Sequence, residues 1–267
     1  MIKSRGREIG GVVAIVTCAL LTSCSADDQH SGHSATDSHQ QGTVISALPQ
    51  PSSTTSAATA APGATVPIGE VPGNANAATA LRPWASDLVA DDIDQLVRKC
   101  WTIDPKNVRG MYADRDGILA AIAQPGVDGQ FAIIWKGPAE TVSVKRSEIA
   151  SGYACPRVSP TGSDASLNEG DARYTVRRYL WRSVGKPVNP DDTEGKYPLT
   201  CPGSVLAANP GRLAGTSAFD DNQLTSKSTG IADVEVSVPV TNSSGVTQTT
   251  IFELNVGPEG YCLNDIG

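Results

Sequence analysis

The residues best suited to bind a ligand are four arginines and two aromatic residues that repeat at helical spacing. They are Arg173, Tyr174, Arg177, Arg178, Trp181 and Arg182. In a helix over residues 171–184 they fall within one half of the helical wheel, and a mostly apolar stripe fills the other half. Guanidinium groups bind carboxylates and phosphates bidentately, while aromatic rings stack on sugars or lie at membrane surfaces. This face is therefore predicted to bind an anion or a glycan. The alternative is a basic face whose arginines pair with acids from the preceding part of the chain.

The N-terminus carries a pattern for covalent lipid attachment at Cys24. A positively charged start precedes an uncharged stretch over residues 9–23. That stretch is too short to span a bilayer, which needs about 20 apolar residues, but it has the length of a signal-peptide core. It ends in Leu21-Thr22-Ser23-Cys24, which resembles the lipobox of bacterial lipoproteins. The resemblance implies that residues 1–23 are a lipoprotein signal peptide and that the Cys24 thiol is acylated, with palmitate among the acyl chains. The alternative is an ordinary secretory signal with an incidental cysteine.

Residues 24–80 are predicted to be the lipidated cysteine followed by a disordered tether. The segment is rich in Ser, Ala, Thr, Pro, Gly and Gln and has almost no aromatic residues. Such a composition cannot bury enough apolar surface to order itself. With the lipobox and the low lysine content, this tether makes the chain similar to the cell-envelope lipoproteins of actinobacteria, mycobacteria among them. That resemblance implies a lipid-anchored protein on the extracytoplasmic face of the cell membrane, and it does not extend to the folded part.

Four cysteines follow the tether, namely Cys100, Cys155, Cys201 and Cys262. An even number of cysteines in an exported chain argues for two disulfides. Of the three pairings we favour Cys100–Cys155 and Cys201–Cys262, because each loop then encloses one run of predicted strands. Zinc is the alternative, but no pair has C-x-x-C spacing and no histidine lies nearby. We therefore assign no metal and no cofactor.

Known catalytic patterns are weak in this chain. The last histidine is His39, which excludes Ser-His-Asp and Cys-His catalysis in the folded part. Ser183-Val184-Gly185-Lys186 matches the S-x-x-K of penicillin-recognising enzymes, but it falls at the end of a predicted helix and not at its start. The acidic loops around Asp114 and Asp191 lack the full spacing of a calcium loop, and adjacent loop acids do not indicate a glycosidase pair facing across a cleft. No catalytic residue is therefore assigned.

Hydrophobic periodicity predicts two halves after the tether. The first, residues 81–160, reads as a helix over residues 86–99 followed by strands at 118–123, 130–135 and 141–149, although 118–123 could be a short helix. The second, residues 165–267, reads as a helix over 171–184, a strongly alternating strand at 232–240, and strands at 246–256 and 261–263. The predicted fold class is α+β, with two small helix-plus-antiparallel-sheet halves, each stapled by one disulfide. The second half is similar in topology to cystatin-like or nuclear-transport-factor-like folds, which host both binders and enzymes.

The charge composition of the chain limits the classes of molecule that it is expected to bind. The chain has 21 Lys and Arg against 28 Asp and Glu, a formal net charge of −7, which disfavours nucleic acid. The sequence therefore predicts a non-catalytic, lipid-anchored binding or scaffold protein that meets another envelope protein or an anionic glycan or lipid. Two alternatives stay open: a carboxylate-dependent cell-envelope hydrolase, and an inhibitor of a host enzyme such as lysozyme.

Overall fold

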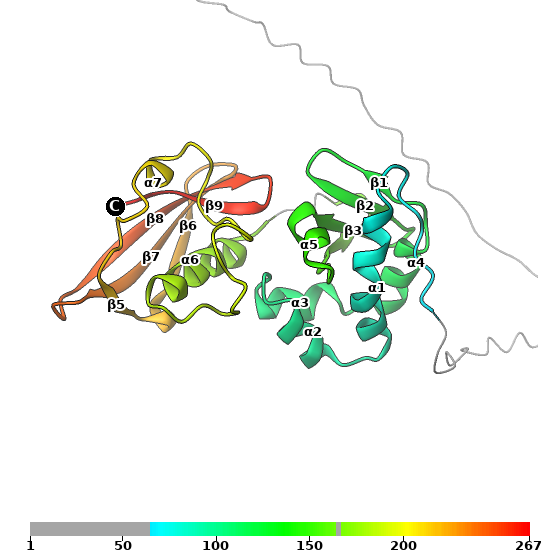
Figure 1. The fold of residues 1–267 in the computed structure, drawn as a ribbon, viewed down its shortest axis with the longest axis horizontal. Coiled ribbons are helices and arrows are strands. Elements are labelled where there is room, and N and C mark those ends of the chain that lie inside the picture. Colours follow the sequence, from blue (N-terminus) through cyan, green and yellow to red (C-terminus); the bar gives the residue numbers. More distant parts are fainter. Residues whose placement is uncertain (1–64, 164–166) are drawn as a thin grey trace, which may run out of the picture. The chain divides into compact units, whose positions relative to one another are not determined.

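The computed structural model of this chain describes residues 65–163 and 167–267. The predicted signal peptide, Cys24 and most of the predicted tether therefore lie outside the described residues. The described part is an α+β fold with two antiparallel sheets and two disulfides, one in each half, which confirms the predicted fold class (Figure 1). None of its helices is long and apolar enough to cross a membrane.

The first half contains one long helix and several short ones beside its sheet. They are α1 (Ala75–Val89), α2 (Ile93–Lys99), α3 (Pro105–Met111), α4 (Arg115–Ile122) and α5 (Arg146–Ser151). The helices α2, α3 and α4 each follow an aspartate, namely Asp92, Asp104 and Asp114, whose carboxylate accepts a hydrogen bond from a backbone N–H of the first turn. Such caps satisfy donors that have no partner inside a helix. The repeated aspartates thus explain why this region forms several short helices.

The first sheet is a meander in which two of the predicted strands, at 130–135 and 141–149, are found, although residues 146–149 are helical. Its strands are β1 (Val127–Asp128), β2 (Ala132–Lys136), β3 (Glu140–Lys145) and β4 (Arg157–Pro160), and each pairs antiparallel with the next. Alternate residues of β2 and β3 are buried, among them Trp135 and Val142, and α4 packs on these two strands. The core of this half also includes Leu81 and Trp84 of α1.

Three predictions about the first half are wrong. The tether was predicted to extend to residue 80, but α1 begins at Ala75, and Ala77 and Ala80 are core residues. Alanine runs resemble a low-complexity spacer, yet alanine is also the strongest helix former. The predicted helix over residues 86–99 is two helices, separated near Asp91, which has a positive φ of 60°. Residues 118–123 belong mainly to α4, so the alternative of a short helix is confirmed; a short apolar run fits either state.

The second half is a sheet covered on one face by a long helix (Figure 1). Its elements are α6 (Glu169–Ser183), α7 (Val205–Ala208), the 3-10 helix η1 (Asp221–Gln223), β5 (Thr216–Phe219), β6 (Thr225–Ser228), β7 (Asp233–Asn242), β8 (Thr247–Gly257) and β9 (Gly260–Ile266). The helix and the three strands predicted from the sequence correspond to α6, β7, β8 and β9. The strand β7 pairs with β5, β6 and β8, and β8 pairs with β9, all antiparallel. The alternating valines of β7 and Phe252 of β8 form a core with Val176 and Leu180 of α6.

The disulfides join the pairs that the sequence favoured. Cys100 bonds to Cys155 in the first half, and Cys201 bonds to Cys262 in the second. Zinc ligation by these four cysteines is therefore contradicted. Each hydrophobic core draws its residues from one half only, although both halves fall within a single compact unit of the chain.

Candidate functional site

Two of the predicted binding arginines, Arg178 and Arg182, converge on one buried carboxylate. The side chain of Asp192 is completely buried, and Arg178 Nη2 donates a hydrogen bond of 2.6 Å to its Oδ1. Arg182 contacts the same oxygen through Nη2 and donates through Nη1 to Glu194 at 2.8 Å. A buried carboxylate needs such partners to offset its lost hydration. Both guanidinium groups therefore have a structural role, which is to stabilise the buried Asp192 carboxylate.

The other two arginines of this face also have acidic partners. Arg177 Nε donates to Asp221 at 2.5 Å, and its Nη1 lies 3.7 Å from Asp104 of the first half. Arg173 lies 3.9 Å from Glu169 in the same helix. The arginines of this face therefore pair with acids, although only Asp104 belongs to the preceding part of the chain that the alternative named. Ligand binding by this face stays a prediction.

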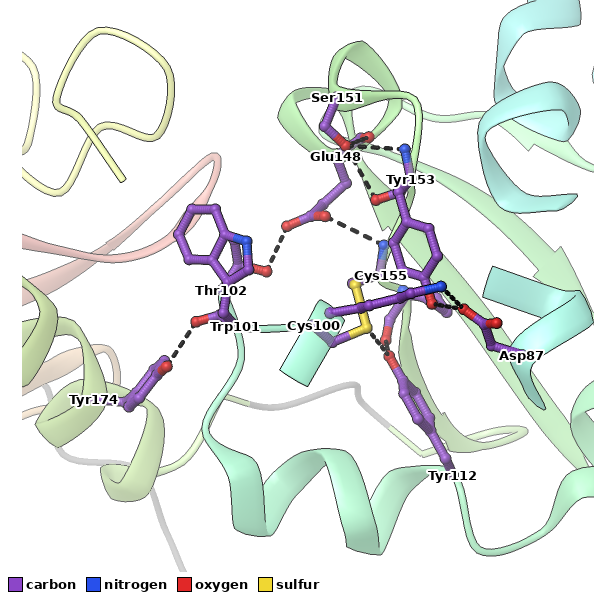
Figure 2. The surroundings of a disulfide bond; sticks show 12 residues. Asp87, Cys100, Trp101, Thr102, Tyr112, Glu148, Ser151, Tyr153, Cys155 and Tyr174 are labelled. Atoms are coloured by element: carbon purple, nitrogen blue, oxygen red, sulfur yellow. Dashed lines mark hydrogen bonds and ion pairs between the residues drawn. A yellow bond between two sulfur atoms is a disulfide. The ribbon is translucent and has the colours of Figure 1, made fainter. Parts of the chain in front are cut away.

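The two aromatic residues of the face are also engaged. Tyr174 is 7% exposed, and its hydroxyl donates a hydrogen bond of 2.6 Å to the carbonyl oxygen of Trp101, as Figure 2 shows. Burial raises the pKa of Tyr174 to about 12. Trp181 packs edge-on against Phe219, with 4.9 Å between the ring centroids. The guanidinium carbon of Arg178 lies over the ring of Trp101, 5.1 Å from the ring centroid, which is a cation–π contact. This face therefore contacts the rest of the chain.

A small polar cavity lies where β3, α5 and the turn between β8 and β9 meet α6. Its volume is about 50 Å³, which is room for a few water molecules or one small ion. Six charged side chains line it, namely Lys145, Glu148, Arg157, Asp171, Arg178 and Glu259. Ionisable groups are rarely buried together unless each is paired or serves a function. The cavity is therefore the best candidate site in the described part of the chain.

Asp171 is fully occupied by its neighbours. Its side chain accepts hydrogen bonds from the backbone N–H of Asn168 at 3.0 Å, as half of a capping box, and from Asn107 Nδ2 at 2.7 Å. It also contacts Arg157 Nη2. The carboxylate lies in the first turn of α6, where the helix dipole favours negative charge. Asp171 thus connects α6 to two residues of the first half.

Glu148 is also bonded on both of its oxygens. It accepts from Thr102 Oγ1 at 2.6 Å and from the backbone N–H of Cys155 at 3.2 Å, next to the first disulfide (Figure 2). Burial raises the pKa of Glu148 above its usual value, and the Thr102 bond opposes that rise. The side chain therefore ties α5 to the segments on either side of the disulfide.

Lys145 differs from these acids, because no ion pair is formed by its ammonium within the described ranges. Its Nζ contacts the carbonyl oxygen of Glu259 in the turn before β9. Burial and the nearby Arg157 lower the pKa of Lys145. In that turn Gly260 has a φ of 104°, and a Cβ there would lie 3.2 Å from Nζ. A desolvated lysine can act as a base or nucleophile, but this cavity admits only groups of a few atoms.

The remaining residues that the sequence offered for chemistry have structural roles. Asp114 caps α4, and Asp191 pairs with Lys196 at 2.6 Å. Ser183 donates to a backbone carbonyl one helical turn back, not toward a lysine. Within residues 65–163 and 167–267, no three His, Cys, Asp or Glu side chains group as metal ligands would.

Of the cavity residues, the sequence singled out only Tyr174 and Arg178, as members of the arginine-aromatic face. Lys145, Glu148 and Arg157 have no distinctive spacing, and Asp171 was read only as the beginning of a helix. The available signal was a Lys-Arg-Ser-Glu run directly after an alternating strand, which places charges at the end of a buried element.

Comparison with known proteins finds no matching family model, no matching characterised protein and no matching solved structure.

Proposed function

We propose that this protein is a lipid-anchored, extracytoplasmic protein of the cell envelope that binds or organises other envelope molecules without catalysis. The observation that carries the proposal is the pair of disulfides formed by the four cysteines after the tether. Disulfides persist mainly in oxidising compartments outside the cytoplasm. They therefore suit a chain whose N-terminus resembles a lipoprotein export signal.

The roles of the acidic side chains favour binding over the hydrolase alternative. A carboxylate-dependent glycosidase needs two acids that face each other across a cleft wide enough for a sugar. Here Asp192 and Asp221 pair with arginines, and Asp114 and Asp220 cap helices. Glu148 and Asp171 line a cavity of only about 50 Å³.

Anchoring tests the proposal most directly. Changing Cys24→Ala should remove the acylation site, so that the protein loses labelled palmitate and either leaves the membrane fraction or accumulates as an uncut precursor. Two fatty chains hold a protein on a membrane stably, whereas one does so only marginally. The matched control is Cys18→Ala, in the same N-terminal segment, which should change neither labelling nor fractionation. Palmitate labelling that survives Cys24→Ala would overturn the proposed anchor.

The binding role needs a second measurement. The full chain should capture a specific envelope protein, glycan or lipid from envelope extracts. Capture of a host hydrolase would instead support the inhibitor alternative, and turnover of an envelope glycan by the purified protein would support the hydrolase.

A further inference from the structure

Two cationic side chains that line the small cavity, Lys145 and Arg157, are half-buried and carry hydrogen-bond donors that are incompletely paired. The Lys145 ammonium has three N–H donors, and Glu259 supplies it with one carbonyl oxygen. Arg157 Nε is buried and has no hydrogen-bond partner among the described residues. A buried charge without a partner is costly, so such donors indicate an acceptor inside the cavity.

The carboxylates that line the cavity do not fill this role. Asp171 is bonded to Arg157 through Nη2, which leaves Nε of the same guanidinium unpaired. Glu148 is bonded to Thr102 and Cys155, and the Glu259 carboxylate accepts from Ser147 at 2.6 Å. Arg178, a third cation of the lining, is committed to Asp192. The cavity therefore presents cationic donors, and the acids in its wall already accept hydrogen bonds from other groups.

We propose that this cavity binds a small oxyanion, a carboxylate or phosphate group, between Lys145 Nζ and Arg157 Nε. Both types of anion have several acceptor oxygens in a compact group, and charge-assisted hydrogen bonds to them are among the strongest in proteins. A volume of about 50 Å³ accommodates such a group but not a sugar ring. The bound group is either a free ion or the acidic end of a larger molecule. The inference rests on the proposed function for its biological role, and it names the class of ligand.

The fold around Lys145 suits a preformed site. The turn between β8 and β9 approaches Nζ closely because Gly260 has no Cβ and adopts a φ of 104°. The Glu259 carbonyl oxygen fixes one direction of the ammonium. Arg157 is held by Asp171 at the beginning of α6. Both donors are thus held in place by neighbouring groups, which reduces the entropy lost when an anion binds.

Calorimetric titration of the purified full chain tests this site. Acetate, inorganic phosphate and glycerol phosphate serve as probes at constant ionic strength, maintained with chloride. The wild type should bind at least one of them saturably at one site, and that probe should raise the melting temperature, since a ligand of the folded state stabilises it. Tighter binding of glycerol phosphate than of phosphate would indicate a group carried by a larger molecule.

Lys145→Met should reduce the affinity by at least about tenfold, because it removes a charged donor while keeping a similar side-chain volume. Lys145→Gln provides a second variant if Met impairs folding. The control is Lys136→Met, at an exposed lysine on the neighbouring strand β2, which should bind as the wild type does.

Absence of saturable binding by the folded wild type would overturn the site, whatever the variants do. Equal affinity in wild type and a folded Lys145 variant would overturn it as well. Neither result would affect the proposed anchor, whose test is acylation at Cys24. Conversely, loss of the anchor would leave the anion titration unchanged.

Discussion

At the scale of single residues, Asp192 is the charge on which the arginines of α6 depend most. It accepts from Arg178 and contacts Arg182, and its side chain is fully buried. Asp192→Asn should destabilise the protein by about 3–5 kcal/mol, because it leaves two guanidinium groups without their carboxylate. The measurement is the free energy of unfolding from urea denaturation of the oxidised protein.

The neighbouring Asp191 supplies a matched control. It forms an exposed ion pair with Lys196, so Asp191→Asn should cost less than about 1 kcal/mol. If the two substitutions lower the free energy of unfolding equally, the arginines of α6 do not depend on Asp192 for their stability.

At the scale of elements, the edge of the second sheet is covered by the segment that the second disulfide holds. The backbone N–H of Cys201 donates to the Leu263 carbonyl at 2.9 Å, and the Leu263 N–H donates to Leu199 at 2.7 Å. Replacing both Cys201 and Cys262 with Ala should lower stability by about 3–4 kcal/mol, because the disulfide closes a long loop. Hydrogen exchange should then speed up first along β9.

The control for that experiment repeats the comparison under reducing conditions. With reductant present, the wild type and the double variant should unfold at similar denaturant concentrations, because both proteins then lack the Cys201–Cys262 bond and the Cys100–Cys155 bond. A double variant with unchanged stability and unchanged exchange in β9 would mean that the sheet edge does not depend on this disulfide. If the double variant exposes the edge of β9, that edge can pair with strands of other chains, so this variant should also aggregate faster than the wild type.

At the scale of the whole molecule, Asp171 is the residue that links α6 to the first half most extensively. It contacts Arg157 and accepts from Asn107, while Tyr174 of the same helix donates to the Trp101 carbonyl. Asp171→Ala should therefore weaken the coupling between the two cores. Calorimetry should show a broadened or divided unfolding transition where the wild type shows one.

Glu169→Ala is the control for that substitution. Glu169 lies in the same first turn of α6 but bonds to Ser226 and Ser228 of its own half, so its loss should shift the transition without dividing it. If Asp171→Ala leaves a single transition of unchanged width, the contacts through Asp171 do not couple the halves.

Local pattern was sufficient for the longest elements of the second half. The alternating valines of β7 predict a strand with one buried face, since side chains alternate between the two faces of a sheet. The apolar stripe of α6 predicts a helix packed on one side. The cysteine pairing followed from the position of each cysteine relative to the predicted strands. By contrast, the sequence analysis missed α3, α5, α7, β1, β4, β5 and β6, because these elements are too short to show a clear periodicity.

What the sequence by itself determined is therefore the α+β class, the antiparallel strands, the helix α6 and the disulfides, all of which depend on local periodicity or on a few cysteines. Only the tertiary structure decided the partners of the charged side chains. Arg177 meets Asp221 44 residues away, and Lys145 meets the Glu259 carbonyl 114 residues away. A helical wheel shows in which direction an arginine points but not what it meets. Those partners lie in the short 3-10 helix η1 and in a turn, whose positions depend on the packing of the whole chain.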